Sequence, residues 1–121
     1  MPRPILDESR IHAAIRAKIA SWNNAVVDEV KAAVAANDVV VVGMKQNPFP
    51  VKARKSLEGI GQPFRYLEYG SYFGMWRPRS ALKMWTGWPT FPMVFVKGTL
   101  VGGASELQAL IDNGELKAML A

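Results

Sequence analysis

A strand-to-helix turn around residue 47 is the place in this sequence where chemistry would be expected. The apolar run VVVVGM (39–44) precedes the turn NPFP (47–50), and the helix-like stretch VKARKSLEGIG follows it. Many α/β proteins keep a nucleophile at the start of such a helix. Here the turn begins with Asn47, whose amide can neither exchange with a disulfide nor ligate iron as a thiolate does.

The rest of the chain offers no substitute for that missing group. It contains no cysteine and a single histidine, His12. Disulfides, thiolate nucleophiles and thiolate metal ligands are therefore excluded together. With one histidine, which we expect to lie on the surface, we predict no metal site built by this chain. Thiol–disulfide exchange on the chain's own residues is impossible.

Asn47 has a sound structural use, and two interpretations of the turn remain open. Asn is among the best residues for capping a helix N-terminus, and Pro48 suits the first helical position. Pro50 still falls within the first turn. The turn is then either a helix start and nothing more, or a helix N-terminus that presents free N–H groups and positive potential to an anion.

Positive charge is concentrated in the middle of the chain. The net charge is +5, and residues 45–97 hold nine Lys and Arg against only Glu58 and Glu68. This pattern indicates either an anionic ligand or acidic protein partner at the middle segment, or simply solvated helix faces. No nucleic-acid motif accompanies the charge, so we expect no nucleic-acid binding.

The elements that position the turn can be read from periodicity and turn residues. Ile11, Ile15, Ile19 and Trp22 predict an amphipathic helix over 8–23, and Lys97-Gly98 predicts a hairpin turn. The apolar run at 39–44 is typical of a buried central strand. Further helices are expected at 25–36, 48–59, 78–86 and 104–112, with a final turn or two over 115–120 and a strand at 64–69. The order predicts a three-layer α/β domain whose first two strands are parallel and whose hairpin completes a mixed sheet.

The stretch WTGWPTFPMVFVKGTLVGGASELQALIDNGEL (85–116) resembles the glutaredoxin branch of the thioredoxin fold, and most of all the monothiol glutaredoxins. The resemblance implies a four-stranded mixed sheet flanked by helices over 25–121, with 1–24 as an added N-terminal helical extension. It places Asn47 at the position of the family's nucleophilic cysteine, and Pro50 at that of the second cysteine or serine. Both active-site positions are therefore degenerate.

The same resemblance implies a residual glutathione site. Lys45 and Arg79 match the family's ligand-binding Lys and Arg, and Gly102-Gly103 match its glycine pair. Thr90-Phe91-Pro92 match its Thr-x-Pro turn, in which the bond before proline is cis. Ala104 and Ser105 replace a Cys-Asp pair, so the hold on the ligand's ammonium group is weakened because a serine brings no charge. Glutathione is the candidate ligand, and no cofactor is implied with certainty.

Three functions remain open on these grounds. The leading hypothesis is a glutaredoxin-like binding or regulatory protein, with glutathione, another small anion or a protein as its partner. The second is a glutathione-dependent oxidoreductase, or an electron-transfer or iron–sulfur accessory protein, that uses a sulfur it does not supply. The third is a structural subunit that forms a homodimer through helix 8–23 or the aromatic segment 69–76, which contains Tyr72, Phe73 and Trp76.

The N-terminal stretch MPRPILDESR has no long apolar core. It therefore resembles neither a signal peptide nor a membrane anchor. We accordingly expect a cytoplasmic location and no association with membranes.

Overall fold

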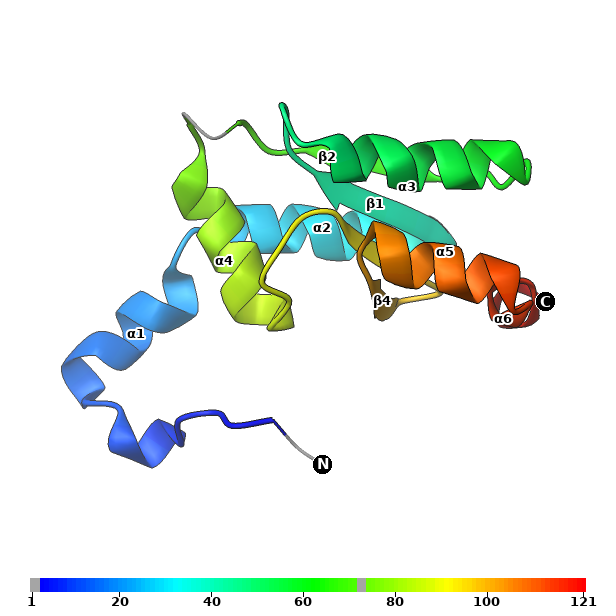
Figure 1. The fold of residues 1–121 in the computed structure, drawn as a ribbon. Coiled ribbons are helices and arrows are strands. Elements are labelled where there is room, and N and C mark those ends of the chain that lie inside the picture. The colour runs from blue at the N-terminus through cyan, green and yellow to red at the C-terminus, as the bar shows by residue number, and fades with distance from the viewer. Residues whose placement is uncertain (1–2, 72–73) are drawn as a thin grey trace.

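The computed structural model describes residues 3–71 and 74–121 (Figure 1). Four strands form one sheet, and helices cover both of its faces. The strands are β1 (Val39–Gly43), β2 (Arg65–Glu68), β3 (Met93–Val96) and β4 (Thr99–Gly102). The helices are α1 (Ala13–Ser21), α2 (Asn24–Ala36), α3 (Pro48–Gly59), α4 (Trp76–Thr86), α5 (Ala104–Asp112) and α6 (Glu115–Leu120), and a 3₁₀ turn, η1 (Glu8–Arg10), precedes them.

The sheet has the mixed topology that the sequence predicts. Its strand order is β2-β1-β3-β4. β1 and β2 are parallel, with Val41 opposite Tyr66, whereas β1 and β3 are antiparallel, with Val41 opposite Val94. The β3–β4 hairpin turns at Lys97-Gly98, and both of these residues have positive φ. The predicted fold class, a thioredoxin-like glutaredoxin fold, is confirmed.

Strand β1 is apolar throughout because both of its faces are buried. Val40 and Val42 pack into one core with α2 and α4, while Val39 and Val41 pack into the other with α3, α5 and α6. Successive strand residues point to opposite faces, so a strand covered on both sides needs a continuous apolar run. The central strand thus contributes to both cores, and α3 begins shortly after its end.

A polar contact ties α2 to the chain segment that follows β2. The Tyr69 hydroxyl donates a hydrogen bond of 2.5 Å to the Glu29 carboxylate. Burial, together with this bond and the negative charge of Glu29, raises the pKa of Tyr69 above its usual value. Tyr69 is therefore a neutral donor at physiological pH, and it anchors the chain leading into α4.

The N-terminal region corrects one prediction. Instead of a single helix over 8–23, the chain forms η1, becomes extended at Ile11, and begins α1 after His12, whose Nδ1 accepts from the Ala14 N–H at 3.0 Å. No residue of α1 is buried, and Ile15 and Ile19 are 45% and 41% exposed. Of the four residues that predict the apolar stripe, only Ile15 and Ile19 lie in α1, because Ile11 is extended and Trp22 follows the end of the helix.

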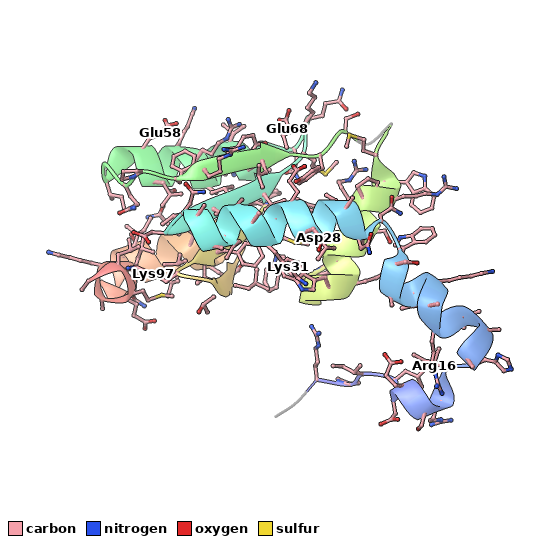
Figure 2. The ribbon with its side chains drawn as sticks, turned by 180° about the vertical axis from the view of Figure 1, so that it is seen from behind. Arg16, Asp28, Lys31, Glu58, Glu68 and Lys97 are labelled. Atoms are coloured by element: carbon pink, nitrogen blue, oxygen red, sulfur yellow. The ribbon has the colours of Figure 1, made fainter. Side chains whose placement is uncertain are left out.

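The arm formed by residues 3–21 projects from the layered body (Figure 1). Figure 2, seen from behind, shows Arg16 on this arm and Asp28 and Lys31 on α2. The start of the arm returns to the body, where the Arg3 guanidinium donates to the Thr86 carbonyl at 3.0 Å, at the C-terminal end of α4. A cation suits that end of a helix. The boundary at residue 24 stays a prediction.

Helix α4 begins earlier than the predicted residue 78. It starts at Trp76, which places Pro78 at the third helical position, still inside the first turn where a missing N–H is harmless. Trp76 is 59% exposed. Tyr72 and Phe73, which the sequence suggests as part of the same aromatic surface, lie outside the described residues.

Among the helices of the described residues, none combines the length and apolar character that crossing a bilayer requires.

Candidate functional site

The start of α3 is built as the sequence predicts. Asn47 is extended and caps the helix, its Oδ1 accepting from the Phe49 N–H at 3.0 Å, and Pro48 occupies the first helical position. Pro50 is buried against β1. A side chain at Gly43 would place its Cβ only 2.8 Å from the Pro50 Cβ, so glycine allows the helix start to sit this close to the strand.

The second hydrogen bond of Asn47 joins two segments far apart in the chain. Its Nδ2 donates to the Phe91 carbonyl at 3.1 Å. Phe91 precedes Pro92, and the peptide bond between them is cis. The amide thus links the helix start to the proline turn, a role that the residue type alone does not reveal.

The first three residues of α3 have no N–H group left for a ligand. An α-helix leaves its first N–H groups without helical acceptors, and these groups commonly bind anions. In α3 two of the first three positions are Pro48 and Pro50, which have no N–H, and the Phe49 N–H is bonded to Asn47. Anion binding by N–H groups of residues 48–50 is therefore excluded, whereas anion binding at this helix start through the helix dipole stays a prediction.

The N-terminus of α5 differs in this respect. The Glu106 carboxylate accepts from the Gly103 N–H at 2.9 Å, and the Gly103 carbonyl accepts from the Leu107 N–H at 3.0 Å. Within the described residues, no acceptor meets the N–H groups of Ala104, Ser105 and Glu106. Three donors at one helix end, with the positive end of the dipole behind them, suit a carboxylate.

Gly102 shapes the entry to α5. It has a φ of +111°, and a Cβ at this position would lie 2.8 Å from the Glu106 Cβ. Both the conformation and the close approach require glycine. The glycine pair predicted from the sequence thus brings the end of β4 directly to the first turn of α5.

A pocket of about 350 Å³ lies between these two helix starts and the cis-proline turn. This volume falls in the range of small-molecule sites. Six of the sequence-predicted site residues line it, namely Asn47, Thr90, Phe91, Pro92, Gly103 and Ser105. Pro48, Phe49, Ala104 and Glu106 complete the lining. A neighbouring hollow, which shares Phe49, Ala104 and Ser105, continues between α3 and α5 past Lys52 and Lys55.

The other two predicted ligand residues do not line this pocket. Lys45 is exposed, and its backbone N–H donates to the Gly70 carbonyl at 2.6 Å. Arg79 is 7% exposed, and its Nη1 donates to the carbonyls of Tyr69 and Gly74 at 3.0 and 2.5 Å. Arg79 therefore holds the chain between β2 and α4, and its role toward a ligand stays a prediction.

Several residues near the pocket are not among the site residues predicted from the sequence. Lys52 lies 5.0 Å from the centroid of the Phe49 ring, and Lys83 lies 5.8 Å from that of Phe91. The indole N–H of Trp88 is buried without an acceptor among the described residues, close to Gly103. Lys83 is four residues after Arg79 on the same helix, and that spacing is the signal that could have placed it on the Arg79 face.

The residues at the site do not fit thiol or iron–sulfur chemistry. The position that would hold a thiolate is Asn47, and both polar atoms of its side chain already have protein partners. The described residues also contain no group of three or more His, Cys, Asp or Glu that could hold a metal ion. The pocket instead has N–H donors that suit a carboxylate at the α5 end and an apolar wall at the α3 end.

A helix start after the central strand, faced by a cis-proline turn on a four-stranded mixed sheet, defines a protein of the thioredoxin fold. No family model matches the sequence. A glutaredoxin-like protein of Dictyostelium discoideum is 47% identical over 98 residues, which cover 81% of this chain and 80% of that one.

Solved structures agree with this likeness. Wheat glutaredoxin matches at 33% identity with a TM-score of 0.68, over 78% of this chain and 88% of that one. A buckwheat glutaredoxin in complex with glutathione shares the fold, with a TM-score of 0.73 at 23% identity over 83% and 91% of the two chains. The chain belongs to the glutaredoxin family. It is a member without any cysteine.

Proposed function

We propose that this protein binds a γ-glutamyl peptide such as glutathione without forming a covalent bond, and that it acts as a binding or regulatory protein. The observation that carries the proposal is the set of free N–H groups of Ala104, Ser105 and Glu106 at a pocket of small-molecule size. The γ-glutamyl carboxylate is the group that these donors would hold. The glutathione complex of the buckwheat protein supports the choice of ligand.

The oxidoreductase alternative has less support. Exchange with a disulfide requires a thiolate, and this chain supplies none. A ligand held here would leave with the same covalent bonds with which it arrived. The cytoplasmic location, a protein partner and the oligomeric state stay predictions.

Replacing Ala104 with proline is expected to weaken binding of reduced glutathione roughly tenfold or more. The change removes one carboxylate donor, and hydrogen bonds to charged groups contribute about 1.5–3 kcal/mol. Proline suits the first position of α5, and the preceding Gly103 is extended, with φ −105° and ψ −157°. Isothermal titration calorimetry on the wild-type and variant chains measures the effect.

The matched control is Ala104→Ser, which keeps the N–H and should bind within about twofold of wild type because no donor is lost. A folded Ala104→Pro variant that binds glutathione as tightly as wild type would place the ligand elsewhere. Absence of binding by the wild-type chain would end the proposal.

A further inference from the structure

The two ends of the pocket differ sharply in polarity. At the α5 end, the N–H groups of Ala104, Ser105 and Glu106 have no acceptor within the described residues. At the α3 end, Pro48 brings no donor, and the Phe49 N–H is already bonded to Asn47. A ligand with one anionic group will therefore place that group at the α5 end.

The α3 end also has its backbone acceptor engaged. The Phe91 carbonyl accepts from the Asn47 amide at 3.1 Å, which uses one of its two lone pairs. What remains accessible is carbon surface. Phe49 is 48% exposed and lines the pocket beside Pro48 and Pro92. An aromatic ring left open beside a pocket favours an apolar ligand group.

We infer that the pocket selects a γ-glutamyl peptide whose sulfur carries a neutral apolar substituent, a thioether-type conjugate of glutathione, over the free thiol or thiolate. This inference rests on the proposed function. Because the α5 start and Asn47 line one pocket, a peptide with its γ-glutamyl carboxylate at α5 would extend the side chain of its next residue toward Asn47. A thiolate there would meet no free N–H donor from residues 48–50, whereas a carbon substituent would meet Phe49.

Magnitudes favour the carbon substituent. The dipole of α3 still attracts an anion, by about two- to fivefold in affinity at an exposed helix end. Each methylene removed from water raises affinity by about fourfold. Lys52 lies over the Phe49 ring but lines the neighbouring hollow rather than this pocket, so it does not stand at the sulfur position. A substituent of a few carbons therefore outweighs the remaining attraction for a thiolate.

The test compares reduced glutathione, S-methylglutathione and S-hexylglutathione by isothermal titration calorimetry on the wild-type chain. We expect S-hexylglutathione to bind at least tenfold tighter than glutathione, with S-methylglutathione between them. N-acetyl-S-hexylcysteine has the apolar group without the γ-glutamyl head and should bind at least tenfold more weakly than S-hexylglutathione. If the three glutathione ligands bind equally, the inference fails and the proposed function stands. If none of them binds, both fail.

A pH comparison isolates the thiol. The thiol of glutathione ionises near pH 8.5. S-methylglutathione lacks this ionisation but has the same other ionisable groups. In the wild-type chain the ratio of S-methylglutathione affinity to glutathione affinity should fall by no more than about fivefold between pH 7 and pH 10, which is the effect of the helix dipole alone. Pro48→Ala restores one N–H at the helix start, and in this variant the ratio should fall several-fold further than in the wild-type chain. A fall of more than about tenfold in the wild-type chain, or equal falls in the two chains, would overturn the inference.

Discussion

Replacing Arg79 with methionine is expected to lower the free energy of unfolding by about 2–4 kcal/mol, because two carbonyl groups lose a charged donor. Arg79 is nearly fully buried, and its Nη1 bonds to the carbonyls of Tyr69 and Gly74. Methionine fills a similar volume without donating, so the buried Tyr69 carbonyl would be left without its Arg79 partner. Urea denaturation followed by tryptophan fluorescence measures the change.

Arg77 supplies the matched control on the same helix. It is exposed, and its guanidinium lies 5.0 Å from the centroid of the Trp76 ring. Arg77→Met should change the free energy of unfolding by less than about 1 kcal/mol, as for other exposed cation–π pairs. Equal stabilities of the Arg79→Met variant and the wild-type chain would contradict the structural role of Arg79 and would favour its predicted role as a ligand residue.

Replacing Asn47 with cysteine is expected to turn a chain without thiol activity into one that reacts with glutathione disulfide. The new thiol would lie at the pocket wall, between Phe49 and Phe91. Loss of the asparagine frees the Phe49 N–H, which can then stabilise a thiolate at the helix N-terminus. The loss of the cap should cost about 1 kcal/mol of stability. The thiolate forms a mixed disulfide with one half of glutathione disulfide and releases the other half as glutathione, and mass spectrometry of the protein measures the rate of this step.

A second cysteine variant controls for the chemistry of any exposed thiol. Ser21 lies exposed on α1, away from the pocket. The Asn47→Cys variant should react at least tenfold faster than Ser21→Cys, because only the first thiol has a glutathione pocket beside it. Equal rates in two folded variants would indicate that the pocket does not position glutathione.

Local signals in the sequence account for most of the fold. Helix α3 was predictable to the residue because Asn47 and Pro48 specify its start through capping chemistry, and Gly59 specifies its end. The β1 run VVVV required burial on both faces, which placed it at the centre of the sheet. The single helix predicted over 8–23 is wrong because Ile11 is extended and His12 caps a new helix, and the spacing of apolar residues does not reveal such a break.

The sequence predicted the parts of the candidate site that are set by backbone conformation. It did not predict the parts that are set by the direction of a side chain. The Thr90-Phe91-Pro92 turn and Gly103 line one pocket because short motifs fix their backbone geometry. The position of Arg79 depends on the loop after Tyr69, whose path no local pattern specifies. That residues 48–50 have no free N–H follows only from the hydrogen bond between Asn47 and Phe49 together with the two prolines.

The most direct test of the account is an amide NMR titration of the isotope-labelled wild-type chain with reduced glutathione. We predict that the N–H signals of Ala104, Ser105 and Glu106 shift most and saturate together, and that the Phe49 N–H shifts less because Asn47 already occupies it. Unchanged spectra at millimolar glutathione, or shifts confined to residues remote from α5, would contradict the claim that this cysteine-less glutaredoxin keeps a working ligand pocket.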